Sequence, residues 1–343
     1  NDPGLDSSQR PRVVFFGTPA FAVPSLRALA LMVDIELSLV VTQPDRPAGR
    51  RQRLQASPVK AAAQDLGLPV YQPTSLRAAA VRERLASVGA DVFVVAAYGQ
   101  IFGPKMLALP RRGCINLHAS LLPAYRGASP VSAAILAGEA VTGVSLMVMD
   151  IGLDTGPVLA TAEEPIRHDD TTETLTTRLA DRAAHLLVPN LAPYVRGELV
   201  ARPQIGAATL TRPLVKADGM LDWTCSAVFL ERQVRAMWPW PRAWTTVTIK
   251  GEPLTMQIHE AQIATGNSPE AGPPGTLVFV DDRAVVRCGS GRLALTTVQL
   301  PGGSPRPGRD LRTLALPRDR VILGAGFPAG EVPPLLSTVD SLS

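Results

Sequence analysis

Three side chains that could share one chemical site lie in the middle of the chain. Asn116 and His118 are two residues apart, and Asp154 follows in a glycine-flanked segment. Residues i and i+2 of an extended segment face the same side, so Asn116 and His118 would point together while Ile115 and Leu117 point the other way. An amide, an imidazole and a carboxylate are therefore available to one site.

This combination of groups suits acyl transfer. A neutral side-chain amide can donate a hydrogen bond to an oxygen that gains negative charge in a tetrahedral intermediate. A carboxylate beside an imidazole can orient the ring and hold its positive charge. No serine or cysteine nucleophile is required if an amine attacks directly. A histidine taken alone is more often structural, and it is the neighbours of His118 that favour a catalytic role.

The elements that must position these residues follow a rhythm of strands and helices as far as residue 200. Apolar runs predict strands at 13–17, 37–42, 70–72, 92–97, 114–118 and 144–149, with helices at 21–31, 59–66, 76–88 and 131–137. Strand and helix in turn predict an α/β fold with a doubly wound, mostly parallel sheet. Such sheets bind ligands at the C-terminal ends of their strands, which is where Asn116 and His118 would lie.

A long helix is predicted to close this first region. Asp170-Thr171-Thr172-Glu173 has the spacing of a capping box, and the helical pattern continues to near Val195 before Gly197. Residues 201–216 then contain prolines and a glycine with little periodicity, and they are predicted to be a linker. The first domain would therefore span residues 12–200.

The pattern changes to short strands in the last third of the chain. After a helix near 225–237, apolar runs at 245–249, 254–264, 276–280, 284–288 and 293–299 are separated by turn signals. Five strands of this spacing favour a small antiparallel barrel, of which the oligonucleotide-binding (OB) type is one option. The second domain would span residues 217–328.

Composition limits the class of protein. Of the 343 residues, 46% are hydrophobic and 19% are charged, which is typical of a globular chain with two domains. The longest apolar runs fall far short of the roughly 20 residues that span a bilayer, so we expect no membrane span. The N-terminus lacks the basic flank and apolar core of a secretion signal, so we expect a cytoplasmic location. The cysteines at 114, 225 and 288 form no CxxC pair and are expected to be buried thiols.

Motifs for several other chemistries are missing from the sequence. The first strand ends Gly17-Thr18-Pro19, with one of the three glycines of a GxGxxG motif, which argues against a nicotinamide or flavin cofactor. The chain has no GxSxG motif and no P-loop. The histidines at 118, 168, 185 and 259 show no local ligand spacing, so no metal is predicted.

A second candidate site is the segment 43–60, which is rich in arginine, proline and glycine. Its basic side chains are Arg46, Arg50, Arg51, Arg53 and Lys60, against the single acidic residue Asp45. This composition predicts an exposed basic loop, which would suit a phosphate backbone. An ordinary solvated surface segment is the alternative.

The quoted motifs carry a family resemblance. The run INLHASLLPAYRG at 115–127, with DIGLDTG at 150–156, resembles the signature of the 10-formyltetrahydrofolate-dependent formyltransferases. Within that superfamily, FGTP at 16–19, VTQPDRPAGR at 41–50 and the Pro-Trp-Pro segment at 239–241 resemble the methionyl-tRNA formyltransferases. The resemblance covers about residues 12–325. Two departures from the usual family residues matter, in the loop at 50–56 and at Met237-Trp238.

The resemblance implies substrates and residue roles. The formyl donor would be 10-formyltetrahydrofolate and the acceptor the α-amine of initiator methionyl-tRNA. The catalytic residues would be Asn116, His118 and Asp154. The residues that help to bind folate would be Ser120, Leu121, Leu122 and Pro123, with a cis peptide at Leu122–Pro123. The residues that approach the tRNA acceptor arm would be Arg46, Arg50, Arg51 and Arg53, and the barrel would hold the RNA by its backbone.

Alternatives remain open from sequence. The same three side chains serve formyltransferases that act on a nucleotide sugar or on glycinamide ribonucleotide, and hydrolases that release formate, although the basic loop and second domain argue against these. The chain could instead be an RNA-binding protein that has lost activity and binds no folate. Trp238, Trp240 and Trp244 are expected to pack in a core, with stacking on RNA as the alternative. We expect a monomer.

Overall fold

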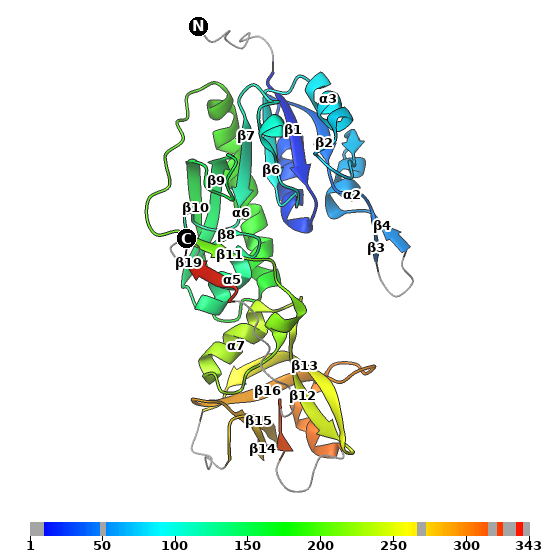
Figure 1. The fold of residues 1–343 in the computed structure, drawn as a ribbon, viewed down its shortest axis with the longest axis vertical. Coiled ribbons are helices and arrows are strands. Elements are labelled where there is room, and N and C mark those ends of the chain that lie inside the picture. The colour runs from blue at the N-terminus through cyan, green and yellow to red at the C-terminus, as the bar shows by residue number, and fades with distance from the viewer. Residues whose placement is uncertain (1–9, 49–52, 266–271, 315–320, 325–333, 339–343) are drawn as a thin grey trace.

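The computed structural model describes residues 10–48, 53–265, 272–314, 321–324 and 334–338. They form an α/β region and, below it in Figure 1, a smaller antiparallel barrel. Both parts of the predicted architecture, the doubly wound, mostly parallel sheet and the small barrel, are confirmed. Among the residues described, no helix is both long enough and apolar enough to cross a membrane.

The α/β region is built on a seven-stranded sheet in the order β10-β9-β7-β6-β1-β2-β5. The strands are β1 (Arg12–Gly17), β2 (Glu36–Val41), β5 (Val70–Tyr71), β6 (Val92–Ala96), β7 (Cys114–His118), β9 (Val141–Val148) and β10 (Val158–Pro165). From β5 to β7 all neighbours are parallel, whereas β9 is antiparallel to both β7 and β10. The edge strand β10 was not predicted from the sequence.

Helices cover both faces of this sheet. They are α1 (Val23–Leu31), α2 (Pro58–Asp65), α3 (Ala79–Ser87), α4 (Pro104–Leu107), α5 (Pro130–Ala137) and α6 (Thr172–Val195). Because successive strand residues face opposite sides, Val13 and Phe15 of β1 pack in the core beneath α1 and α6, while Val14 and Phe16 pack in the core beneath α3. A strand buried on both faces must be apolar at every position, which explains the continuous hydrophobic runs.

The start of α6 differs from the prediction by one residue. The cap is Thr171 rather than Asp170: the Thr174 N–H donates to Thr171 Oγ1 at 3.3 Å, and the Thr171 N–H donates to Thr174 Oγ1 at 3.0 Å. Asp170 is instead used by an ion pair with Arg178, which removes its carboxylate from capping. The predicted end of the helix is confirmed, since Gly197 has the positive φ, 77°, that favours glycine after a helix.

The basic segment forms a hairpin where the sequence predicted a loop. Strands β3 (Arg46–Ala48) and β4 (Arg53–Gln55) pair in antiparallel register, and the ribbon projects from the α/β region in Figure 1. Its base is fixed by Asp45, which accepts hydrogen bonds from Lys60 Nζ at 2.6 Å and Gln72 Nε2 at 2.7 Å. The exposed Arg46 thus begins a ribbon with an anchored base.

The segment 201–216 contains a strand of its own. Strand β11 (Thr209–Thr211) pairs in parallel with β8 (Arg126–Gly127) and in antiparallel with β19 (Leu336–Thr338). Two further hydrogen bonds join Arg202 to Val158 of β10, at 2.8 Å each. The connecting segment, by which we mean residues 201–216, is therefore paired with the α/β region at Arg202 and at β11.

The barrel confirms the five predicted strands and adds two short ones. Its elements are α7 (Ala227–Ala236), β12 (Ala243–Ile249), β13 (Glu252–Ile263), β14 (Thr276–Val280), β15 (Arg283–Arg287), β16 (Arg292–Gln299), β17 (Arg306–Pro307) and β18 (Val321–Ile322). The sheet runs β12-β13-β16-β15-β14-β18. The Gly324 N–H, just after β18, donates to Thr246 O of β12 at 2.9 Å, so the sheet nearly closes on itself.

Candidate active site

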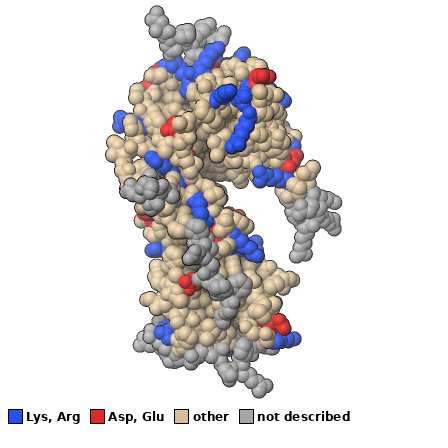
Figure 2. Space-filling view, in the orientation of Figure 1, with Lys and Arg blue, Asp and Glu red and all other residues tan. Residues whose placement is uncertain are grey.

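Asn116 and His118 lie on one face at the C-terminal end of β7, as predicted. Ile115 and Leu117 point into the core on the opposite face. Strands β1 and β7 both run toward the side of the sheet on which the barrel lies in Figure 1. The space-filling view in Figure 2 shows a hollow between that side of the α/β region and the barrel.

Asp154 is brought to the same place by the loop after β9. Its Oδ1 lies 3.5 Å from Asn116 Nδ2, and its Oδ2 lies 3.5 Å from His118 Nδ1. Oδ2 also accepts the Gly127 N–H at 2.9 Å. The backbone at Asp154 is left-handed, with φ 53°, which an aspartate tolerates better than most residues. The three predicted side chains therefore meet around one carboxylate, and we call them the triad.

His118 faces hydrogen-bond acceptors at both ring nitrogens. Nε2 lies 2.9 Å from the backbone oxygen of Tyr125, and because a carbonyl only accepts, Nε2 must carry a proton. Nδ1 faces the Asp154 carboxylate. The two contacts together fix the orientation of the ring. The side chain is 6% exposed, which shields the pair from water.

Tyr125 is held firmly where it contacts His118. Its N–H donates to Thr209 Oγ1 at 2.7 Å, and its hydroxyl donates to Glu139 Oε1 at 2.6 Å. Burial, followed by the hydrogen bond and charge of Glu139, raises the pKa of the Tyr125 hydroxyl well above its ordinary value. This phenol therefore stays protonated and acts as a fixed hydrogen-bond donor.

The predicted folate-binding turn follows directly after β7. The Leu122–Pro123 peptide is cis, as predicted. Ser120 is fully buried, and its hydroxyl donates to Ala124 O at 2.6 Å, so that hydroxyl is used within the turn. Ser145 ties the turn to β9 by donating to Ser120 O at 2.7 Å and accepting from Leu122 N at 3.0 Å. Leu121, Leu122 and Pro123 are half-buried, apolar residues of this turn.

The described strands of the hairpin do not lie next to β7. In Figure 1 the hairpin stands apart from β7. Arg46 is exposed and donates to Gln43 Oε1, and Gln43 is anchored in turn through Nε2 to Tyr98 O at 2.7 Å. Arg50 and Arg51 lie outside the described residues, and only the backbone of Arg53 is described. The predicted contacts of these arginines with tRNA stay predictions.

The cysteines offer no obvious nucleophile. Cys114 and Cys288 are buried, as expected, and burial raises the pKa of each thiol to about 12. Cys225 is half-buried rather than buried, and burial raises its thiol pKa as well. Within the described residues no group of three His, Cys, Asp or Glu side chains is placed to hold a metal ion.

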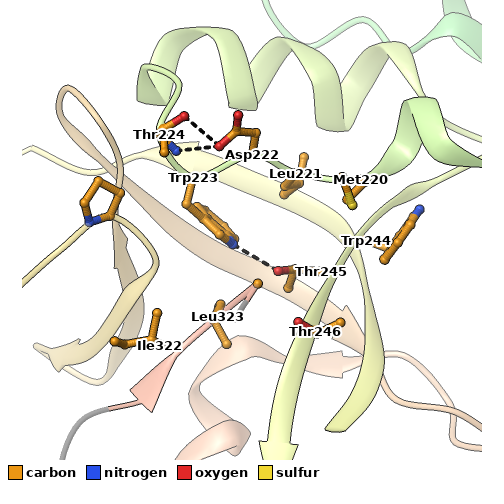
Figure 3. Close-up of a pocket in the computed structure, with 12 residues that line it drawn as sticks. Met220, Leu221, Asp222, Trp223, Thr224, Trp244, Thr245, Thr246, Ile322 and Leu323 are labelled. Atoms are coloured by element: carbon orange, nitrogen blue, oxygen red, sulfur yellow. Dashed lines mark hydrogen bonds between the residues drawn. The ribbon is translucent and has the colours of Figure 1, made fainter. Parts of the chain in front are cut away.

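The tryptophans behave differently from one another. Trp240 is 55% exposed, so the expectation that it packs in a core was wrong. Trp238 and Trp244 are half-buried and donate through Nε1 to Glu173 Oε2 and Lys216 O, both at 3.1 Å. The barrel also contains a cavity of ≈ 210 Å³ that Trp223 lines, with its Nε1 donating to Thr245 Oγ1 at 3.0 Å (Figure 3). No residue of the triad lines that cavity.

Sequence analysis missed several groups that support the triad. They are the backbone groups of Tyr125 and Gly127, and the side chains of Thr209 and Gln204. For Gly127 the sequence offered a clue, since the residue is a glycine. Its φ is 100° and a Cβ there would collide with the Thr211 carbonyl oxygen, so the position requires glycine. For Gln204 and Thr209 the sequence offered no clue, since they lie in a segment without periodicity.

Comparison with known proteins places these features in a family. A family model described as formyl transferase matches residues 11–191, and one described as formyl transferase, C-terminal domain, matches residues 213–313. The chain is 46% identical over 302 residues to the methionyl-tRNA formyltransferase of Roseiflexus sp. (strain RS-1), covering 88% of this chain and 91% of the relative. It is 44% identical over 302 residues to the methionyl-tRNA formyltransferase of Sorangium cellulosum (strain So ce56), covering 88% and 95%.

One solved structure shows a similar fold. It is the N-formyltransferase from Helicobacter canadensis in complex with folinic acid and dTDP-3-aminofucose, with a TM-score of 0.62, 16% sequence identity, and coverage of 83% of this chain and 98% of that chain. At this level of identity the likeness concerns the fold alone.

Proposed function

The chain belongs to the formyl transferase family, and on that premise we propose that it transfers the formyl group of 10-formyltetrahydrofolate to the α-amino group of initiator methionyl-tRNA. The product serves the initiation of protein synthesis. Relatives that carry this activity in their names match nearly the whole chain, including the barrel. The folate is a co-substrate, consumed in each turnover.

The convergence of Asn116, His118 and Asp154 is the observation that carries the proposal. The methionine amine attacks the formyl carbon, a C–N bond forms, and the carbonyl electron pair moves to oxygen. Asn116 directs one amide hydrogen toward Asp154 Oδ1, which leaves its second hydrogen for the oxyanion. The positive charge of His118, held by Asp154 and Tyr125 O, stabilises the same negative oxygen from nearby.

Collapse of the intermediate completes the transfer. The bond between the formyl carbon and N10 breaks, its electron pair stays on N10, and a proton that the attacking nitrogen loses is delivered to N10. The His118–Asp154 pair, directly or through a water, moves that proton. The two 3.5 Å contacts of Asp154 are long for hydrogen bonds, and such contacts often tighten only when substrate binds.

The remaining parts of the chain bind the two substrates. The half-buried Leu121, Leu122 and Pro123 form one wall for the folate beside the triad. The hairpin with Arg46, Arg50, Arg51 and Arg53 approaches the acceptor arm, supported by its anchored base and its charge. In this proposal residues 12–200 are the catalytic domain, 201–216 connect, and 217–328 hold the tRNA by its backbone. We also propose that the protein acts in the cytoplasm as a monomer, because the triad needs no residue from a second chain.

A direct assay tests this function. The purified protein is expected to formylate initiator methionyl-tRNA with 10-formyltetrahydrofolate, and to leave elongator methionyl-tRNA and an amino-sugar nucleotide essentially unmodified. Formylation of the sugar nucleotide in place of the tRNA, or release of formate without any acceptor, would replace the proposal by one of its rivals. His118→Ala is expected to lower kcat by several powers of ten. Near-normal turnover in that variant would end the proposed role of the triad.

A further inference from the structure

Gln204 of the connecting segment holds the loop that carries Asp154. Its Nε2 donates to Asp154 O at 2.8 Å and to Gly156 O at 2.7 Å. Its Oε1 accepts from Arg126 Nε at 3.1 Å and from Arg126 Nη2 at 2.7 Å. One half-buried amide thus fastens the left-handed turn at Asp154 to the segment that supplies the Gly127 N–H to the Asp154 carboxylate.

Thr209 of the same segment holds the partner of His118. Its Oγ1 accepts the Tyr125 N–H at 2.7 Å, while the oxygen of Tyr125 accepts from His118 Nε2 at 2.9 Å. Next along the strand, Thr211 Oγ1 donates to Arg126 O at 2.9 Å and accepts from Ser129 N at 3.0 Å. Strand β11 therefore fixes the backbone on which the triad depends.

Most of the connecting segment, residues 201–212, lies between the two parts of the chain that the family models match. The two family models end at residue 191 and begin at residue 213, so neither includes Gln204 or Thr209. The segment nevertheless contacts the immediate supports of two triad residues, and it leads directly into the barrel. It is thus placed to link the barrel to the geometry of the triad.

We propose that Gln204 and Thr209 are positioning residues for formyl transfer, Gln204 by fixing the Asp154 loop and Thr209 by fixing the Tyr125 carbonyl that orients His118. This inference rests on the proposed catalytic roles of the triad. Neither side chain takes part in the chemistry. Their effect is on geometry, to which rates are sensitive, because a misplacement of about 1 Å can cost a hundredfold in rate.

Gln204→Ala gives the first test, with a matched control. The variant is expected to lower kcat about ten- to a hundredfold with little change in KM for methionyl-tRNA. Gln233→Ala is the control, because the buried Gln233 amide also donates to two backbone oxygens, Asp218 O at 2.8 Å and Met220 O at 3.0 Å, but in the barrel. An equal loss of kcat in both variants, or no loss in Gln204→Ala, overturns the inference.

Thr209 gives a test that does not depend on how Gln204→Ala folds. Thr209→Val keeps the shape of the side chain but removes the acceptor of the Tyr125 N–H, so kcat is expected to fall. Thr209→Ser keeps the hydroxyl and is expected to restore most of kcat. Equal activity of the valine and serine variants would show that the hydroxyl positions nothing.

A double variant separates positioning from general loosening of the fold. If Gln204 acts through the triad, adding Gln204→Ala to His118→Ala should change the residual rate by no more than about twofold, because the residues act as one unit. A full additional loss in that background contradicts the inference. The proposed role of the triad fails separately, when His118→Ala alone keeps normal activity.

Discussion

Asp154 and Asp170 belong to the same α/β region, yet the fold uses their carboxylates in opposite ways. Asp170 is almost fully buried, and both of its oxygens accept short bonds from Arg178, at 2.6 and 2.7 Å. The Arg167 N–H adds a bond at 2.7 Å. Asp154 meets His118 and Asn116 only at 3.5 Å and keeps one short bond, from the Gly127 N–H.

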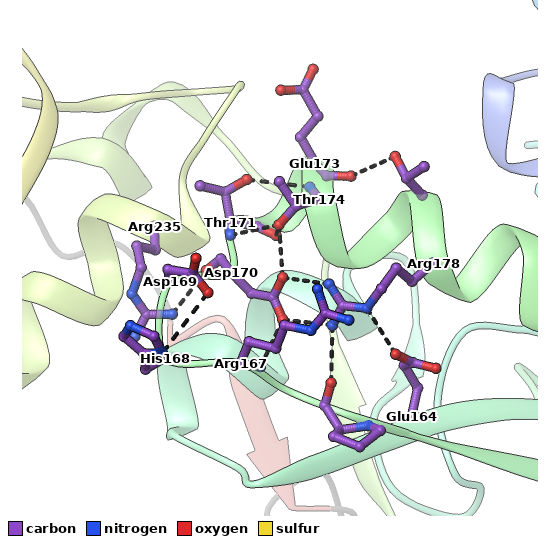
Figure 4. Close-up of polar contacts among 12 residues, drawn as sticks. Glu164, Arg167, His168, Asp169, Asp170, Thr171, Glu173, Thr174, Arg178 and Arg235 are labelled. Atoms are coloured by element: carbon purple, nitrogen blue, oxygen red, sulfur yellow. Dashed lines mark hydrogen bonds and ion pairs between the residues drawn. The ribbon is translucent and has the colours of Figure 1, made fainter.

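The surroundings of Asp170 form the junction between the two regions. Arg178 also donates to Glu164 Oε1 at 2.8 Å (Figure 4). The backbone oxygen of Asp170 accepts from Arg235 of α7 at 2.8 Å, and Thr172 Oγ1 donates to Ala236 O at 2.7 Å. These contacts attach the first helix of the barrel to the start of α6, next to the ion pair of Asp170 with Arg178.

The contrast between the two carboxylates shows which part of this fold is held rigidly. Short charge-assisted bonds with every oxygen satisfied make the junction a fixed scaffold. Long contacts at the triad leave the carboxylate of Asp154 able to respond when charge develops on a substrate. The same substitution at each position, aspartate to asparagine, should therefore damage activity at one and stability at the other.

Asp154→Asn is expected to show the largest effect. Asparagine keeps the shape and can still accept the Gly127 N–H, but it removes the negative charge that holds the His118 ring. We expect kcat to fall on the order of 10²- to 10⁴-fold, while the free energy of unfolding changes by less than about 1 kcal/mol. Steady-state kinetics and urea denaturation measure the two quantities. A stable variant with wild-type kcat would show that the contact with His118 is incidental.

Asp170→Asn is expected to do the reverse. It removes the negative charge opposite Arg178 and one of the two oxygens that accept from it, and leaves Arg178 with Glu164 and the Pro165 carbonyl oxygen. Loss of this charge-assisted pairing at a buried position should cost about 2–3 kcal/mol of stability. The kcat of the folded protein should stay close to that of the wild type, because no triad residue contacts Asp170. If unfolding free energies of variant and wild type coincide, the junction does not depend on this ion pair.

Acid should reveal the same ion pair in the wild-type protein. Burial alone would raise the pKa of Asp170, but the hydrogen bonds from Arg178, Arg167 N and Thr174 outweigh burial and lower the pKa from 3.8 to about 2. A lowered folded-state pKa means that the stabilisation is complete above the unfolded value and is lost as pH falls through the folded value. The difference in free energy of unfolding between wild type and Asp170→Asn should therefore shrink between pH 4 and pH 2. A difference that stays constant in urea titrations across that range would contradict this assignment.

The parts of the fold that sequence predicted are those with a strong local signal. The alternation of Ile115 and Leu117 with Asn116 and His118 was sufficient to assign the two faces of β7, because burial on one side leaves a single consistent register. Strand β10 escaped prediction since, at the edge of the sheet, it is only partly buried. The N-cap of α6 is Thr171 and not the predicted Asp170, because the Asp170 carboxylate pairs with Arg178. No local sequence pattern indicates that pairing.

The site was predicted in its chemistry but not in its supports. Asn116, His118 and Asp154 are polar residues in otherwise apolar or glycine-rich surroundings, which made them visible. Gln204 and Thr209 act through contacts with Asp154 and Tyr125 that lie far away in sequence. Such long-range hydrogen bonds depend on where the connecting segment is folded, and composition alone describes that segment as a linker.

Neutralising the hairpin extends the comparison to a third surface and should have the smallest effect on the enzyme itself. Arg50, Arg51 and Arg53 changed together to Gln should leave stability and kcat at saturating tRNA unchanged, because strands β3 and β4 of the hairpin stand apart from β7 and α7 in Figure 1. Binding of methionyl-tRNA should weaken, and the slope of log Kd against log salt should fall by about 1 for each phosphate that the variant no longer neutralises. Arg77, Arg82 and Arg84, changed to Gln together, remove the same charge from the surface around α3 and serve as the control. An equal change of slope in both triple variants would mean that the hairpin contributes only net charge, whereas a change confined to the hairpin variant places phosphate against it.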